Sequence, residues 1–147
     1  MSTLLPVDRA CMVLALVAAA ESGCRDEVPV GAVLRDVQGR VIAAAGNQPI
    51  RNHDPVGHAE IRVLQQAGHR IGNYRLTDAV MMVTLAPCQL CRQALRLARI
   101  RRVIYGSEAL EQKTKRPEGG LIFKRLQPFS KNSDSVLRFF FEQKRKS

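Results

Sequence analysis

The feature that most constrains the fold is an apolar run, AVMMVTLA at residues 79–86, that leads directly into the sequence PCQLC. A nearly continuous apolar run of this length is typical of a strand buried on both faces of a sheet. Pro87 ends the strand, and residues 88–100 have the spacing of an amphipathic helix. The sequence therefore predicts an internal strand followed by a helix that begins at two cysteines, Cys88 and Cys91.

The rest of the chain predicts an alternation of helices and strands. Helices are expected at residues 7–22, 58–68 and 133–147, paired β segments within 28–47, and short strands at 102–106 and, as the only further candidate, 121–126. Gly23 and Gly68 are expected to end the first two helices, and Ser133 or Asp134 to cap the last one. This order predicts a three-layer α/β/α fold, with a central mixed sheet and helices on both faces, as a single domain over residues 1–147.

Positive charge is concentrated in the C-terminal part of the chain. The formal net charge is +10, and residues 92–147 hold fifteen of the 23 basic residues against five of the 13 acidic ones. Residues 1–91 are neutral. A neutral half followed by a basic half indicates a polyanionic partner, with nucleic acid first, a membrane surface as a weaker alternative and plain solubility as the remaining explanation.

No segment indicates export or membrane insertion. The apolar stretch CMVLALVAAA is too short to span a bilayer, and Asp8 beside Arg9 removes the positive region that opens a signal peptide. Four cysteines without an export signal predict a reducing compartment and no disulfide framework, so we expect a cytoplasmic protein. Cys11 is expected in the core and Cys24 near a helix end.

The pair Cys88 and Cys91 allows three interpretations: a metal site, a redox couple, or two buried thiols. A helix N-terminus favours thiolates in both metal and redox sites. The sequence HAE, which opens the predicted helix at His58, adds a third soft ligand. Three protein ligands leave one position of a zinc ion open for water, as in catalytic sites. The other two histidines, His53 and His69, have no obvious ligand spacing.

Glu60 is the candidate acid–base residue. An acid two positions after a histidine ligand, at a helix start beside an open metal position, can take a proton from water and pass it to a ring nitrogen. A glutamate here can also merely complement the helix dipole, but the Pro-Cys-x-x-Cys sequence downstream favours the catalytic interpretation. The combined pattern, H-x-E followed by P-C-x-x-C, is the signature of zinc deaminases.

Four stretches of the chain resemble the bacterial tRNA-specific adenosine deaminases, a family of the cytidine-deaminase-like superfamily. They are EVPVGAVL, NQPIRNHDPVGHAEI, NYRLTDAVMMVTLAPC and RIRRVIYG, and they cover most of residues 27–106. The metal motif identifies only the superfamily, whereas NYRL and PIRNHDP are more specific to the tRNA branch. The resemblance implies a homodimer that hydrolyses a C–N bond of a cyclic amidine, converting the wobble adenosine of a tRNA anticodon loop to inosine.

The resemblance also implies roles for individual residues. It implies zinc (Zn2+) ligands at His58, Cys88 and Cys91, a proton shuttle at Glu60, a nucleoside contact at Asn47, a base pocket at Val30, Pro49 and Leu85, and backbone support of the attacked amine around Ala59 and Pro87. Near the C-terminus, Phe140, Phe141, Lys144 and Arg145 suit base stacking and phosphate contact. Anchoring of the last helix to the core is an equally good explanation of the phenylalanines.

The chain departs from the family pattern at four places. Ala86 replaces a glutamate, and the run from Ser107 to Ala109 replaces a small residue followed by Arg-Asp. The sequence CRQAL at the second cysteine, Cys91, resembles nucleoside cytidine deaminases, and the region after Gly120 is shorter. The family aspartate at the position of Ala109 lies close to the nucleic-acid backbone. An alanine there is therefore expected to weaken the preference for RNA and to admit single-stranded DNA.

Three functions are consistent with these features: a deaminase acting on a tRNA anticodon stem-loop, a superfamily deaminase acting on a free base or nucleoside such as cytidine, and a non-catalytic RNA-binding partner subunit. The basic C-terminal half and NYRL argue against the second. Glu60 argues against the third, because a non-catalytic subunit has no use for a proton shuttle. We therefore expect a zinc-dependent adenosine deaminase that acts on tRNA.

Overall fold

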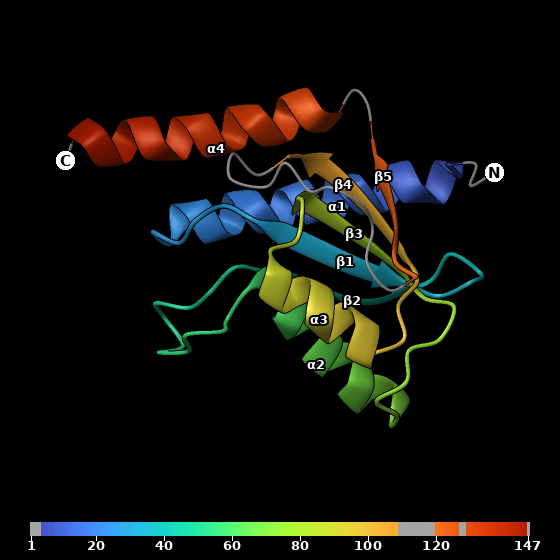
Figure 1. Ribbon diagram of the computed structural model, residues 1–147. Helices are drawn as coiled ribbons and strands as arrows, with labels where there is room; N and C mark the ends of the chain where they lie inside the picture. The colour runs from blue at the N-terminus through green and yellow to red at the C-terminus, as the bar shows by residue number, and fades with distance from the viewer. Residues whose placement is uncertain (1–3, 109–119, 127–128, 147) are drawn as a thin grey trace.

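The computed structural model describes residues 4–108, 120–126 and 129–146, without the side chains of residues 129–131, 133, 136–137 and 141 (Figure 1). Along the chain the elements are α1 (Pro6–Cys24), β1 (Gly31–Arg35), β2 (Val41–Gly46), α2 (Ala59–Ile71), β3 (Val80–Leu85), α3 (Gln89–Leu97), β4 (Arg102–Ser107), β5 (Ile122–Arg125) and α4 (Phe129–Lys146). None of these helices combines the length and apolar character needed to cross a membrane.

The strands form one mixed sheet of five strands in the order β2-β1-β3-β4-β5. β1 pairs antiparallel with both β2 and β3, while β3, β4 and β5 are parallel to one another. The predicted hairpin is confirmed, with Gly39 at positive φ in its turn. The candidate strand at residues 121–126 is confirmed as β5, an edge strand.

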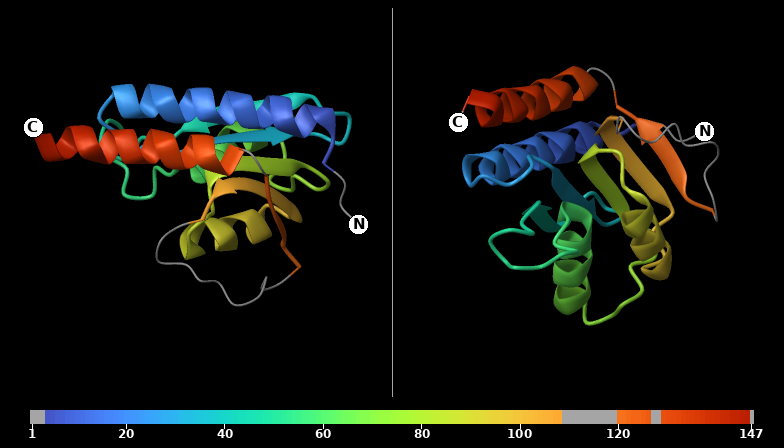
Figure 2. Two further views of the ribbon diagram at one scale, coloured as in Figure 1. Left: turned by 90° about the horizontal axis from the view of Figure 1, so that it is seen from above. Right: turned by 60° about the vertical axis from the view of Figure 1, so that its left-hand side comes forward.

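Helices cover both faces of this sheet, which confirms the three-layer α/β/α prediction (Figure 2). α1 and α4 pack on one face, and α2 and α3 on the other. β3 is buried on both faces, as its apolar run predicts: Met82 belongs to the core beneath α1, and Met81 and Val83 belong to the core beneath α2 and α3.

α1 lies unusually close to the sheet at the edge where β1 begins. Gly31 and Gly46 are cross-strand partners there. A Cβ on Gly31 would collide with the Ala15 carbonyl oxygen, and one on Gly46 would collide with the Ser22 hydroxyl. Two adjacent glycines therefore let the helix backbone rest directly on the strands.

Four predicted helix boundaries were wrong. Gly23 lies inside α1, which ends one residue later at Cys24. Gly68 lies inside α2, which continues to Ile71 and ends at Gly72, a residue with φ 73° in the left-handed region. A glycine inside a helix costs only about 1 kcal/mol, whereas glycine takes up the left-handed conformation after a helix without strain. α3 ends at Leu97, earlier than predicted, and α4 begins at Phe129, four residues before Ser133.

The fold brings two helix starts to one edge of the sheet, the edge formed by the carboxyl ends of β2 and β3. β2 and β3 both run antiparallel to β1, so their C-terminal ends, Gly46 and Leu85, lie at one edge. α2 follows β2 after a loop, and α3 follows β3 almost directly. Sites in α/β sheets are commonly found outside the carboxyl ends of the strands, which makes this edge the place to look for one.

Candidate metal and catalytic centre

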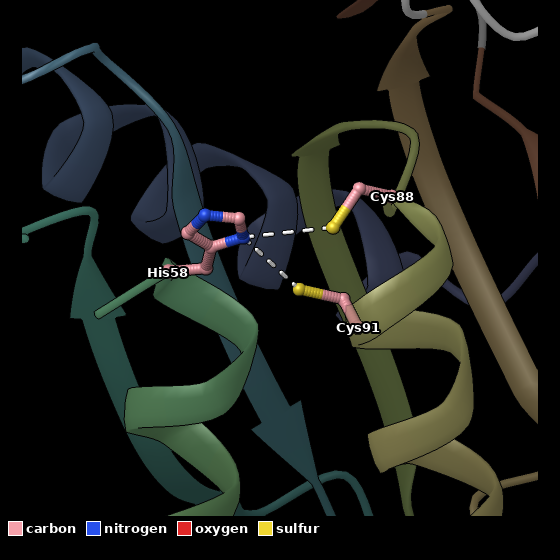
Figure 3. Close-up of side chains that lie close together, drawn as sticks. All are labelled: His58, Cys88 and Cys91. Carbon is pink, nitrogen blue, oxygen red and sulfur yellow. Dashed lines mark hydrogen bonds between the residues drawn. The ribbon is translucent and has the colours of Figure 1, made fainter. Parts of the chain in front are cut away.

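His58, Cys88 and Cys91 converge at this edge of the sheet (Figure 3). The His58 Nδ1 atom lies 3.6 Å from Cys88 Sγ and 3.4 Å from Cys91 Sγ. Within the described part of the chain, these residues are the group of three or more His, Cys, Asp and Glu side chains able to hold a metal ion, with all ligand atoms within 4.8 Å of one another. The predicted ligand set is therefore assembled from two helix starts.

The spacing fits a tetrahedral zinc ion. With Zn–N near about 2.0 Å and Zn–S near about 2.3 Å, a tetrahedral site has N···S edges of about 3.5 Å. Both His58–cysteine distances, 3.4 and 3.6 Å, match this edge. One imidazole nitrogen facing two sulfur atoms at once is better explained by a shared cation than by two hydrogen bonds.

The geometry of the cysteine pair favours a metal site over a redox couple, because both sulfur atoms face one nitrogen of His58. Cys91 is buried, and burial, together with Glu60 and Cys88, raises the pKa of the Cys91 thiol far above its ordinary value. In this position Cys91 becomes a thiolate only beside a strong positive charge, which a divalent metal supplies.

Glu60 lies in the first turn of α2 and is 4% exposed. Burial raises the pKa of its carboxyl, while a hydrogen bond with the Cys91 side chain acts in the opposite direction. The carboxyl is thus in contact with one candidate ligand and two positions from another. A buried carboxyl beside an open metal position is suited to carrying a proton.

The residues expected around the substrate lie at the same edge. Asn47 directly follows β2, is buried, and donates its backbone N–H to the Val30 carbonyl at 2.8 Å. Ala59 is fully buried beneath the first turn of α2, and Leu85 ends β3. Pro49 packs on Gly57, where a Cβ would come within 3.0 Å of the Pro49 Cα atom. This contact brings Pro49 next to the residue that precedes His58.

Sequence reasoning missed Glu27 as a residue that shapes the site. Its carboxylate is 1% exposed and accepts the backbone N–H groups of Arg51 at 2.9 Å and Ile50 at 3.3 Å. It therefore holds the loop that runs from Asn47 to His58. Glu27 opens the stretch EVPVGAVL, but nothing in the local sequence shows which loop the carboxylate meets.

The C-terminal candidates are only partly described. Phe140 is half-buried and approaches Gly23, and Lys144 pairs with Asp26 at 3.1 Å while its Nζ lies 5.8 Å from the Phe140 ring centroid. These contacts hold α4 against the end of α1, which favours the anchoring explanation for Phe140. Arg145 is exposed.

Three further residues in the C-terminal part of the chain are relevant to nucleic-acid binding. Ala109 and the side chain of Phe141 lie outside what the structure describes. Phe139 is 64% exposed on α4 and is the better placed of the described phenylalanines for stacking.

The remaining histidines and cysteines do not join the metal group. His53 and His69 are exposed in the 47–58 loop and in α2. Cys11 is buried in the core beneath α1, as predicted, and Cys24 is exposed at the last position of α1.

Several known proteins are similar to this chain. The cytidine and deoxycytidylate deaminase zinc-binding region matches residues 6–107. A tRNA-specific adenosine deaminase of Agrobacterium fabrum is 40% identical over 150 aligned positions, which cover 91% of this chain and 93% of that protein. A tRNA-specific adenosine deaminase of Haemophilus influenzae is 39% identical over 68% of this chain and 58% of its own length.

A solved structure agrees with this comparison. It comes from work on A-to-I editing by tRNA:A34 deaminases at the wobble position of transfer RNA, and it is 37% identical to this chain with a TM-score of 0.77. The match covers 88% of this chain and 99% of the solved one.

Proposed function

This chain belongs to the zinc-binding cytidine and deoxycytidylate deaminase family and, within it, to the tRNA-specific adenosine deaminases, and we propose that it converts the wobble adenosine of a tRNA anticodon loop to inosine. The observation that carries this proposal is the placement of Glu60, buried and in contact with Cys91, beside the group formed by His58, Cys88 and Cys91. A ligand triad with an adjacent proton carrier is the equipment of hydrolytic deamination.

Zinc is the metal that the family binds, and His58, Cys88 and Cys91 are the residues that would hold it. When bound, zinc lowers the pKa of water so that a nucleophile is available near neutral pH. The Glu60 carboxylate takes a proton from the attacking water and delivers it to a ring nitrogen of adenine. The bond between C6 and the amine then breaks, so that one water is consumed and one ammonia is released.

The surrounding residues position the base. Asn47 contacts the nucleoside, while Val30, Pro49 and Leu85 line the pocket, and the backbone at Ala59 and Pro87 supports the departing amine. All of these residues lie at the edge where α2 and α3 begin. An unpaired anticodon loop suits such a site, because its base can leave the stack at low cost.

The basic C-terminal region grips the RNA. Arg145 supplies charge to the phosphates, with Lys144, Phe140 and Phe141 on the same helix. At Ala109 a carboxylate that would select the ribose 2′-OH is missing, so single-stranded DNA is accepted more readily. The neighbouring Glu108 is a poor substitute for that missing carboxylate, because its own carboxylate accepts a hydrogen bond from the Tyr105 hydroxyl at 3.4 Å.

The protein works as a homodimer in the cytoplasm, where tRNA is found. A groove of about 630 Å³ runs between α2 and α3 and includes Leu64, Ala94 and Leu97, of which Leu97 is 72% exposed. Its rim carries Tyr74, also largely exposed. An apolar groove of this kind is suited to burial against a second copy. Sedimentation of Leu97→Glu beside the unaltered protein tests it: a monomer in both samples contradicts the dimer.

Deamination assays with matched substrates test the function. The zinc-loaded protein would be given an anticodon stem-loop with adenosine at the wobble position, free adenosine and free cytidine, and inosine, uridine and ammonia would be measured. We expect inosine from the stem-loop far faster than product from either nucleoside. Faster turnover of free cytidine supports the nucleoside deaminase instead, and tight RNA binding without turnover supports the non-catalytic subunit.

A further inference from the structure

Arg92 contacts the corner between β3 and α3 in two ways. Its backbone N–H donates to the Cys88 carbonyl at 2.9 Å, the first hydrogen bond of the helix. Its side-chain Nε donates to the carbonyl of Pro87, the residue before the N-cap Cys88, at 3.0 Å. Two successive carbonyls at the corner that carries a metal ligand are therefore held by one residue.

The Arg92 side chain is itself held by the sheet. Its guanidinium carbon lies 4.8 Å from the centroid of the Phe123 ring, within the range of a cation–π contact. Phe123 belongs to β5 and packs against the core on the α2 and α3 face of the sheet. The stack fixes the direction of the guanidinium, and it links the edge strand β5 to a corner that leaves the sheet two strands away.

Among the described residues, few contacts besides those of Arg92 hold this corner. α3 has only nine residues, and helices this short are marginal without tertiary contacts. Cys88 is the N-cap but makes no side-chain capping hydrogen bond. Before the corner, the Ala86 N–H donates to the Ser107 carbonyl at 2.8 Å. The turn is thus held by β4 on one side and by Arg92 on the other.

We propose that Arg92 is a positioning residue for the metal centre: its guanidinium, stacked on Phe123, fixes the Pro87–Cys88 peptide and so the direction in which the Cys88 thiol faces His58. This inference rests on the proposed zinc site. The partners that orient metal ligands commonly account for a tenfold to hundredfold difference in metal affinity. Arg92 would then act through Cys88, without touching the substrate.

The test compares Arg92→Ala, Arg92→Lys and Phe123→Leu with Arg101→Ala, which removes an exposed arginine just after α3. Zinc affinity would be measured by competition with a chromophoric chelator. The absorption spectrum of the cobalt-substituted protein would report the ligand geometry. Turnover on the stem-loop would give kcat and KM separately, and circular dichroism would confirm folding.

We expect Arg92→Ala to bind zinc about tenfold to a hundredfold more weakly, with an altered cobalt spectrum and a lower kcat at nearly constant KM. Arg92→Lys should restore little of this, because an ammonium lacks both the planar stack and the fixed Nε donor. Phe123→Leu should fall between, and Arg101→Ala should match the unaltered protein in zinc affinity and in cobalt spectrum. Where Arg92→Ala does not fold, the Lys and Leu variants decide the question.

The opposite result is equally clear. Zinc affinity and cobalt spectra like those of Arg101→Ala would overturn the inference, even in a variant that unfolds at a lower temperature. A raised KM with unchanged metal affinity would assign Arg92 to RNA contact instead. A Cys88→Ala protein that keeps full zinc affinity would contradict the proposed metal site itself, which separates that failure from the failure of the Arg92 inference.

Discussion

His58 and Cys88 both occupy the N-cap position of a helix, where side chains usually accept hydrogen bonds from the first turn. Neither side chain does so here, and both point toward the metal position instead (Figure 3). The first turns of α2 and α3 therefore direct their N–H groups and positive dipole ends toward the site. Both favour the thiolate and carboxylate forms that a metal centre with a proton carrier needs.

Glu60→Gln should keep its zinc and lose its chemistry. Glutamine has nearly the same shape but cannot carry a proton, and the acid–base step is commonly worth about a hundredfold to ten-thousandfold in rate. We expect kcat on the stem-loop to fall by that factor, with unchanged zinc content and RNA affinity. Turnover close to that of the unaltered protein would place the proton carrier elsewhere.

Glu27→Ala should loosen the loop between β2 and α2. It leaves the N–H groups of Ile50 and Arg51 without their carboxylate partner, and an unsatisfied buried donor costs about 1–3 kcal/mol. We expect a loss of that size in the free energy of unfolding, measured in urea, and a raised KM, because Pro49 lies in this loop. Glu27→Gln, which keeps one acceptor oxygen, is the matched control. A KM equal in all three proteins would show that the loop is held by other contacts.

At the scale of the elements, the contact between α1 and the sheet leaves no space for a side chain at Gly31. Gly31→Ala should destabilise the protein by about 1–3 kcal/mol, because the new Cβ would force α1 away from β1. Urea unfolding measures this change. Gly68→Ala is the control, since its Cβ would have the Asn73 carbonyl at 3.5 Å as its nearest neighbour and alanine favours a helix interior. A Gly31→Ala protein as stable as the control would mean that α1 can shift freely.

The edge strand β2 is protected by the helix that covers it. Arg70 of α2 donates to the Ile42 carbonyl, and Arg62 donates to the Gly46 carbonyl, both at 2.6 Å. Exposed edges invite pairing with other chains, and charged side chains on their backbone groups oppose it. α2 therefore carries the start of the metal site and also shields the sheet edge beside it.

Over the whole molecule, the basic end of α4 is carried on the opposite face of the sheet from α2 and α3. α4 lies along α1 and extends past the sheet (Figures 1 and 2). The ion pair between Lys144 and Asp26 is well exposed, and such pairs contribute little to stability. This ion pair therefore adds little to the free energy of folding, and the contact of Phe140 with the end of α1 contributes more to holding α4 in place.

RNA binding should weaken steeply with salt, and the end of α4 should contribute to that dependence. Each phosphate contact to a single strand adds about 0.7 to the slope of log K against log salt. Removing residues 142–147, which include Lys144, Arg145 and Lys146, should lower both the affinity for a stem-loop and this slope. Arg40→Ala, in the exposed turn between β1 and β2, should change neither. An affinity that does not change with salt concentration would show that these residues do not contact phosphates.

The sequence by itself determined the internal strand, the two helix starts and the three side chains that converge as candidate metal ligands. Each of these follows from a local sequence pattern. For β3 the pattern is an unbroken apolar run, and for the site it is the spacing of His58, Glu60, Cys88 and Cys91. It also predicted the three layers, because strands that alternate with helices have few ways to bury both. The helix ends were harder to predict from the sequence. Either Gly68 or Gly72 can end α2, and only the folded structure shows that Gly72 takes the left-handed conformation.

Tertiary structure alone decided how the site is supported. Glu27 reaches Arg51 across 24 positions, and Arg92 reaches Phe123 across 31. No periodicity connects such pairs, because each contact exists only after the sheet has set the strand order and the helices have packed on it. The candidate ligands belong to short motifs at the starts of two helices, so the sequence alone can reveal them. The residues that hold those ligands in place come from distant elements, which only the folded chain brings together.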